Sequence, residues 1–124
     1  MTRKILVIDD EPDILTMVAR RLKANQYQVT TAGSGEEGLE LAKKYLPDLV
    51  LLDYVMPDMR GDVVLKHLKE DAVLSPVPVV VFTADAKEVK PGEIQKLGAS
   101  GCLFKPFTTE ELLGTIRSLL GENA

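Results

Sequence analysis

Short apolar runs alternate with amphipathic segments along the whole chain, and this alternation constrains the fold more than any other feature. Three runs rich in Val, Ile and Leu are too brief for buried helices: Lys4 to Ile8, Asp48 to Leu52 and Val77 to Phe82. Continuous apolar runs of this length are typical of strands covered on both faces, as in a parallel sheet. Tyr27 to Thr31 and Gly101 to Phe104 are weaker strand candidates, and the first is polar enough for a sheet edge.

Helical patterns fill the intervals between these runs. Four predicted helices each carry one apolar stripe, formed by Ile14, Leu15, Val18 and Leu22, by Leu39, Ala42 and Leu46, by Val64, Leu65 and Leu68, and by Leu112, Leu113, Ile116, Leu119 and Leu120. Ser34 followed by Glu37 predicts a capping box at the start of the second helix. Thr108 followed by Glu111 predicts another at the start of the last helix.

The fourth helix has the least regular pattern. Pro91-Gly92 falls where this helix should begin, and proline in a helix interior costs about 3 kcal/mol. Proline at the first helical position avoids that cost. We therefore expect a short helix, about Pro91 to Leu97, after a long loop from Ala84 to Lys90.

Strand and helix thus alternate five times, with no linker, low-complexity tract or internal repeat. Regular alternation predicts a single doubly wound α/β domain over residues 1–124, a (βα)5 three-layer sandwich with a parallel five-stranded sheet. We expect the flavodoxin-like strand order 2-1-3-4-5, which is common for such sheets. Only Gly121 to Ala124 follow the last helix, so we expect no output domain in this chain.

Charge and composition narrow the function classes. The net charge of -4 and the pI near 5.0 argue against direct binding to nucleic acid or to an anionic membrane. Cys102 is the only cysteine, so an intrachain disulfide and a cysteine metal cluster are excluded. No apolar run approaches the roughly 20 residues that span a bilayer. The first residues do not form a secretory signal, and we expect a soluble cytoplasmic protein.

Polar groups follow four of the five predicted strands. The first strand ends in Asp9-Asp10-Glu11, the third in Asp53, the fourth in Thr83 and the fifth in Lys105-Pro106. Right-handed crossovers bring the carboxyl ends of the strands to one edge, where ligands bind in open α/β sheets. Any one of these residues is as simply explained as a helix cap or a solvated group. Their joint occurrence predicts a functional site.

The residue types at this edge indicate phosphoryl transfer to an aspartate. Three close carboxylates raise each other's pKa unless a cation joins them. Oxygen ligands without His or Cys suit Mg²⁺. Lys105 supplies a charge that can neutralise a phosphoryl group, and Thr83 supplies a hydroxyl donor. A carboxylate nucleophile with a metal, a lysine and a hydroxyl meets the needs of this reaction.

Several segments resemble the signature of the response-regulator receiver domains of two-component signalling, including the chemotaxis regulators: Lys4 to Glu11, Asp53 to Pro57 with Gly61, Thr83-Ala84, Gly98 to Gly101, and Lys105 to Phe107. The resemblance covers nearly the whole chain. It implies that Asp53 accepts a phosphoryl group from a histidine kinase, a phosphotransfer protein or a small phosphodonor. It also implies a signalling domain, not an enzyme with an external substrate, although the domain assists its own phosphorylation and dephosphorylation.

The resemblance implies roles for the other residues as well. Asp10, Asp53 and the backbone carbonyl of Val55 would bind Mg²⁺, with Asp9 acting directly or through water. Thr83 and Lys105 would contact the phosphoryl oxygens, and a cis peptide bond would precede Pro106. A downstream protein would bind the face formed by the fourth helix, the fifth strand and the fifth helix. The chain would be a monomer or a weak dimer.

The sequence departs from the family pattern at Cys102, where many receivers have Tyr or Phe as a switch coupled to the threonine. The simplest interpretation of Cys102 is a small buried strand residue. We hypothesise that the loop before Pro91 and the helix after it carry more of the switching. Val55 and Asp85 occupy positions that, by family likeness, tune self-hydrolysis of the aspartyl phosphate.

Three other functions compete with this interpretation. A phosphatase of the haloacid-dehalogenase kind needs a second acidic residue two after the nucleophile, and this chain has Val55 there. A flavodoxin-like FMN carrier needs a phosphate loop after the first strand, where Asp9-Asp10-Glu11 would repel the phosphate. A dinucleotide-binding protein needs the G-x-G-x-x-G motif, which this chain lacks.

His67 has no second histidine for a metal site and fits a surface position.

Overall fold

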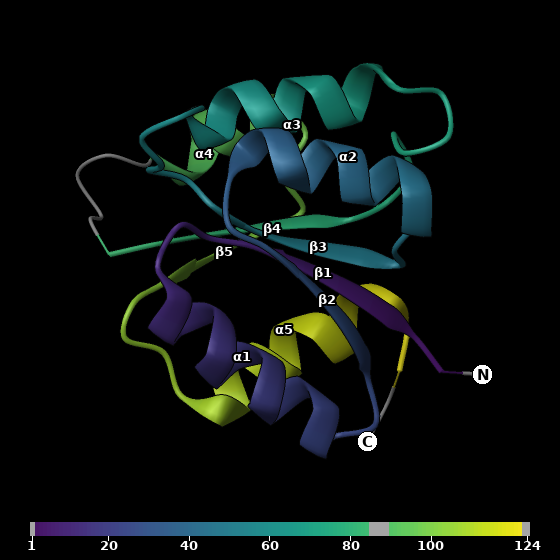
Figure 1. Cartoon of the computed structure of the whole chain (residues 1–124), viewed down its shortest axis with the longest axis vertical. Coiled ribbons are helices and arrows are strands. Elements are labelled where there is room, and N and C mark those ends of the chain that lie inside the picture. Colours follow the sequence, from purple (N-terminus) through teal and green to yellow (C-terminus); the bar gives the residue numbers. More distant parts are fainter. Residues whose placement is uncertain (1, 85–89, 123–124) are drawn as a thin grey trace.

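The computed structural model describes residues 2–84 and 90–122. Within these ranges the chain forms five strands and five helices in strict alternation (Figure 1). In chain order they are β1 (Lys4–Ile8), α1 (Pro12–Ala24), β2 (Gln28–Ala32), α2 (Gly35–Tyr45), β3 (Leu49–Asp53), α3 (Gly61–Glu70), β4 (Val79–Thr83), α4 (Pro91–Lys96), β5 (Gly101–Phe104) and α5 (Thr109–Leu120).

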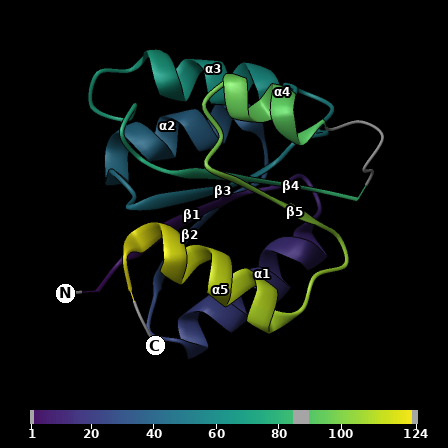
Figure 2. The same ribbon diagram turned by 180° about the vertical axis from the view of Figure 1, so that it is seen from behind.

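The strands form one parallel sheet in the order β2-β1-β3-β4-β5, which confirms the predicted order and the edge position of the polar strand β2. Helices α1 and α5 cover one face, and α2, α3 and α4 cover the other, as Figures 1 and 2 show from opposite sides. The predicted three-layer sandwich is therefore confirmed. No helix among the described residues is both long and apolar enough to cross a membrane.

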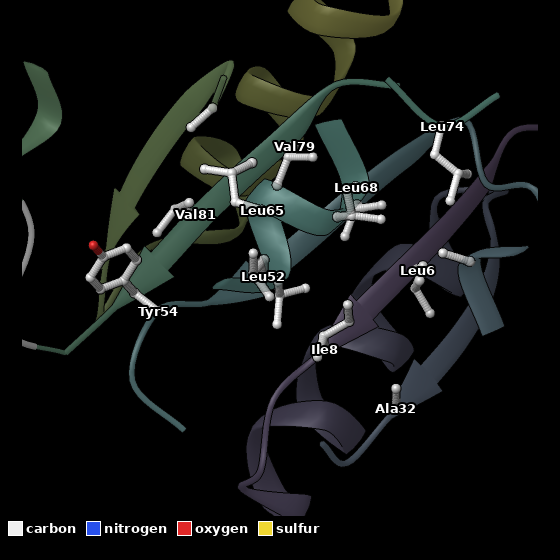
Figure 3. Close-up of a cluster of buried hydrophobic side chains, with 14 of the residues drawn as sticks. Leu6, Ile8, Ala32, Leu52, Tyr54, Leu65, Leu68, Leu74, Val79 and Val81 are labelled. Carbon is white, nitrogen blue, oxygen red and sulfur yellow. The ribbon is translucent and has the colours of Figure 1, made fainter. Parts of the chain in front are cut away.

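Two hydrophobic cores explain why the central strands are continuously apolar. Leu6 and Ile8 of β1 point into the core under α2, α3 and α4, whereas Ile5 and Val7 point into the core under α1 and α5. Strands β3 and β4 alternate in the same way. Figure 3 shows the first core, where Leu65 and Leu68 of α3 lie over Leu52 and the valines of β4. Burying each such side chain contributes about 1.5–3 kcal/mol.

The predicted capping boxes had different outcomes. At α5 the box is complete, because Thr108 Oγ1 accepts the Glu111 N–H at 3.0 Å and Glu111 Oε1 accepts the Thr108 N–H at 3.3 Å. At α2 only half of the prediction is right. Ser34 Oγ accepts the Glu37 N–H at 3.1 Å, but the Glu37 carboxylate accepts the N–H of Gly33 at 2.9 Å. The carboxylate thus reaches one residue beyond the cap.

Strands β1 and β5 have the predicted bounds, whereas the bounds of β2, β3 and β4 differ from the prediction by one or two residues. The structure begins β4 at Val79 instead of Val77, because Val77 N donates to Leu74 O in a turn and Pro78 has no N–H to donate. Strand β3 begins at Leu49 and includes Asp53, and β2 runs one residue later than predicted. Helix α4 is short, as predicted, and ends at Lys96.

Part of the predicted loop from Ala84 to Lys90 lies outside the described residues. Residues 85–89, and with them Asp85, belong to that part of the chain. The predicted cis peptide bond between Lys105 and Pro106 is present.

Candidate functional site

Four carboxylates meet at the carboxyl edge of the sheet. One oxygen from each of Asp9, Asp10, Glu11 and Asp53 lies within 4.8 Å of the others. Asp9 and Asp53 are buried, with exposed fractions of 0% and 3%, whereas Asp10 and Glu11 are exposed. The convergence arises because β1 and β3 are parallel neighbours that end side by side. The structure therefore brings together the three aspartates that the sequence predicted.

Backbone N–H groups fix the two buried carboxylates. Asp9 Oδ1 accepts the Glu11 N–H at 2.9 Å, so the carboxylate is held by the turn that leads into α1. Asp53 Oδ1 accepts the Val55 N–H at 3.4 Å. Gly61 then begins α3 directly against this segment, and a Cβ there would lie 2.6 Å from Tyr54 Cα. Glycine at this position allows the loop after Asp53 to return to α3.

Lys105 places its ammonium group among the carboxylates. Its Nζ lies 3.0 Å from Asp9 Oδ2, 3.4 Å from Glu11 Oε1 and 3.8 Å from Asp53 Oδ2. The same atom lies 4.9 Å from the centroid of the Phe82 ring, within the range of a cation–π contact. Only 12% of the Lys105 side chain is exposed. Lys105 is thus part of the site, as predicted from the end of β5.

Thr83 is the last residue of β4 and is buried at this edge, with an exposed fraction of 1%. Its backbone carbonyl accepts the Lys105 N–H at 2.8 Å. This bond continues the pairing of Thr83 with Phe104 beyond the end of β5. The predicted threonine and lysine are therefore tied together through the main chain.

Burial and the charges at the site shift two pKa values. Burial and the charge of Asp9 raise the pKa of Asp53 to about 7, although the Lys105 ammonium and the Val55 N–H oppose this rise. Burial lowers the pKa of Lys105, but the hydrogen bond that its ammonium donates to Asp9 and the charges of Asp53, Asp9 and Glu11 outweigh burial and raise it. Asp53 therefore carries a poorly compensated negative charge, and one lysine does not neutralise the cluster.

The donor set fits a hard divalent cation. All four residues of the cluster offer carboxylate oxygens, two of them buried and two open to solvent. Mg²⁺ is commonly held by one or two carboxylates and keeps several waters, which the exposed side of the cluster permits. Soft metals are disfavoured because no His or Cys belongs to the cluster.

Sequence reasoning missed two neighbours of the site. Glu11 was placed at this edge but given no role, although its carboxylate contacts Lys105. The sequence predicts Phe82 only as the end of a strand, whereas its ring packs beneath the Lys105 ammonium. The position of Glu11 directly after Asp9-Asp10 was the available signal.

Cys102 lies half-buried on β5 beside the α2, α3 and α4 core, and burial raises the pKa of its thiol.

Comparisons with known proteins agree with this geometry. The family model described as "Response regulator receiver domain" matches residues 5–117. Protein PilH of Pseudomonas aeruginosa is 35% identical over 94% of this chain and 97% of its own length. The alkaline phosphatase synthesis transcriptional regulatory protein PhoP of Bacillus subtilis is 35% identical over 97% of this chain, which spans only 49% of that protein.

A solved structure supports the same family assignment. The chemotaxis protein CheY4 of Vibrio cholerae superimposes with a TM-score of 0.88 and 32% identity, over 96% of this chain and 99% of its own. The sequence match, the strand order and the polar residues at the strand ends therefore lead to one conclusion. The chain belongs to the response regulator receiver domain family of two-component signalling.

Proposed function

We propose that the chain accepts a phosphoryl group on Asp53 in a Mg²⁺-dependent reaction, and that phosphorylation switches its contacts with other proteins. The donor would be a histidine kinase, a phosphotransfer protein or a small phosphodonor. The observation that carries the proposal is the position of Asp53, a buried carboxylate 3.8 Å from the Lys105 ammonium and within 4.8 Å of three further carboxylates.

The nucleophile in this proposal is the Asp53 carboxylate. One of its oxygens attacks the phosphorus atom, the bond from phosphorus to the donor's leaving group breaks, and that group takes up a proton. The pKa of about 7 belongs to the metal-free site, and a cation bound beside Asp53 would lower this pKa and keep the carboxylate ionised for the attack. Because Asp53 has an exposed fraction of only 3%, the donor must present its phosphoryl group at the mouth of the site.

The remaining residues of the site would balance charge. Asp9, Asp10, Asp53 and the backbone carbonyl of Val55 would hold Mg²⁺. When bound, this ion supplies positive charge that offsets the carboxylates and the phosphoryl oxygens. The Lys105 ammonium, which contacts Asp9 at 3.0 Å, would pair with a phosphoryl oxygen, and the Thr83 hydroxyl would donate to another.

The same proposal includes the downstream contacts. A partner protein would bind the face of α4, β5 and α5, where Leu97 and Phe104 expose 41% and 39% of their surface. We further propose that residues 1–124 form one receiver domain in the cytoplasm, as a monomer or weak dimer without direct contact to nucleic acid. With Cys102 at the usual aromatic position, α4 and the segment before it would carry more of the switching.

Intact-mass spectrometry after incubation with acetyl phosphate tests the chemistry. We expect one added phosphoryl group on the wild type when Mg²⁺ is present, and none on Asp53→Asn or when Mg²⁺ is removed by chelation. An adduct that persists in Asp53→Asn would place the acceptor elsewhere. Absence of an adduct on the wild type, together with no binding of beryllium fluoride, would overturn the proposal.

A further inference from the structure

Two exposed apolar side chains lie far from the carboxylate cluster and face one hollow. Val73 and Leu46 expose 63% and 51% of their surface, the largest values among the exposed large hydrophobic residues in the described ranges. Both line a hollow of about 200 Å³, together with Lys43, Asp71 and Leu74. We call Tyr45, Leu46 and Val73 the α2–α3 end patch, since it lies where α2 ends and beyond the end of α3.

The patch lies at the opposite end of the sheet from Asp53. Figures 1 and 2 show the carboxyl end of α2 and the loop after α3 at one end of the molecule, and the carboxyl end of β4 at the other. The Lys4 Nζ, at the start of β1, donates to the Tyr45 carbonyl at 3.4 Å. The α2–α3 end patch is therefore separate from the phosphoacceptor and from the α4, β5 and α5 face.

The backbone of Leu46 is strained for a leucine. Its φ of 49° and ψ of 69° place it in the left-handed region, where it closes α2 by donating its N–H to Ala42 O at 3.0 Å. Glycine or asparagine ends a helix in this conformation at lower cost. Half of the Leu46 side chain is exposed, so core packing does not repay the strain. Leucine is therefore a costly residue at this position, which favours a role in binding.

The charges around the patch are unbalanced. Asp71 Oδ1 accepts the N–H groups of Val73 and Leu74, at 2.9 and 3.1 Å. Within residues 2–84 and 90–122, by contrast, Lys43 has no ion pair, and the Lys44 Nζ lies 5.3 Å from the centroid of the Tyr45 ring. Two ammonium groups thus lie beside the patch against the one Asp71 carboxylate, which keeps its negative charge, and the excess positive charge favours an acidic ligand.

We propose that the α2–α3 end patch docks a segment of a partner protein that presents apolar side chains flanked by carboxylates. Leu46 and Val73 would contact the apolar side chains, and Lys43 and Lys44 would face the carboxylates. A second copy of the chain fits poorly, because a two-fold contact would bring the same lysines together. The small apolar area suits a peptide segment better than a large domain.

A library of random dodecapeptides displayed on phage supplies the probe. Peptides would be selected on the wild type and counter-selected on the double variant Leu46→Asn/Val73→Thr. We expect enrichment of Leu, Ile or Phe next to Asp or Glu. A recovered peptide should bind the double variant and Lys43→Glu/Lys44→Glu about tenfold or more weakly than the wild type. Selection without acidic enrichment, or equal binding to the double variant, would overturn the proposal.

Two controls separate this docking from the rest of the molecule. Val63→Thr changes another exposed apolar residue, at the other end of α3, and should leave peptide affinity unchanged. Asp53→Asn should also bind the peptide normally, so that failure of the phosphoacceptor proposal would not be mistaken for failure of this one.

Thermal unfolding distinguishes a docking role from a structural one. If Leu46 serves binding, Leu46→Asn should raise Tm, because asparagine tolerates the left-handed conformation, while it weakens peptide binding. A fall in Tm would show that Leu46 supports the fold and would overturn the proposal.

Two further measurements address other occupants. A dimer in sedimentation velocity that Leu46→Asn/Val73→Thr abolishes would replace the proposal with self-association. Flotation with phosphatidylserine vesicles that Lys43→Glu/Lys44→Glu abolishes would replace it with a membrane contact. A monomer that does not float would agree with a protein segment as the ligand.

Discussion

Leu52 and Asp53 are consecutive residues of β3 with nearly equal burial and opposite effects on stability. Leu52 has an exposed fraction of 0% and packs in the core under α2, α3 and α4. Asp53 has an exposed fraction of 3%, and burial raises its pKa to about 7. The comparison teaches that burial stabilises the middle of this sheet, whereas at its carboxyl edge burial opposes the charge that the proposed chemistry requires.

The largest effect is expected in the middle of the sheet. Leu52→Ala should lower the free energy of unfolding by about 2–5 kcal/mol, because it removes buried methyl groups and leaves a cavity. Urea denaturation followed by circular dichroism measures the change, with the exposed Val63→Ala as the matched control. A loss below about 1 kcal/mol would show that the strand is not packed as tightly as the structure indicates.

The next effect should have the opposite sign. In the absence of metal, Asp53→Asn should stabilise the fold at about pH 8 by roughly 1–4 kcal/mol, where the upper figure corresponds to the full pKa shift at 1.36 kcal/mol per unit. The folded protein holds the Asp53 proton more tightly than the unfolded chain does. The stability of the wild type relative to Asp53→Asn should therefore fall as pH rises from about 4 to about 7.

Chemical denaturation in EDTA across this pH range measures the difference between the two proteins. An Asp53→Asn variant that is less stable than the wild type at high pH would contradict the assigned cost of burying the carboxylate.

Mg²⁺ should offset part of the cost of burying Asp53 and so reduce the contrast between the carboxyl edge of the sheet and its middle. At about ten times its dissociation constant, Mg²⁺ should stabilise the wild type by about 1.4 kcal/mol, because it binds the folded site and not the unfolded chain. Asp53→Asn should gain less stability from Mg²⁺ than the wild type does. Thermal unfolding with increasing MgCl₂ measures this, and NaCl at matched ionic strength is the control. Equal stabilisation of both proteins would indicate that the ion acts away from Asp53.

The smallest effect should come from an exposed member of the same cluster. Asp10 contributes an oxygen to the carboxylate cluster but is exposed. Asp10→Asn should change the metal-free stability by no more than about 0.5 kcal/mol, while it weakens stabilisation by Mg²⁺. Denaturation with and without Mg²⁺ tests both statements. A large gain in metal-free stability would mean that crowding of charges, more than burial, sets the cost at Asp53.

Much of the site followed from the sequence because a parallel sheet brings strand ends together. Asp9, Asp53, Thr83 and Lys105 each follow or end an apolar run, and the sheet order then makes them neighbours. The contact between Glu11 and Lys105 did not follow, since it joins residues 94 positions apart through side-chain geometry.

The predicted capping box at α2 was partly wrong because two backbone N–H groups compete for one carboxylate. Ser34 and Glu37 have the spacing of a capping box, but Gly33 offers its N–H to the same carboxylate. The left-handed backbone of Leu46 had no sequence signal at all, because leucine is a poor choice for that conformation.

The sequence by itself determined the alternation of strands and helices, the ends of α5 and the polar residues at the strand ends. These depend on periodicity, on caps within one turn and on the rule that parallel strands end at one edge. Only the tertiary structure decided that Asp9 and Asp53 are buried while Asp10 is exposed, and that Leu46 and Val73 share one hollow. Burial and pKa depend on neighbours from distant parts of the chain, which periodicity does not specify.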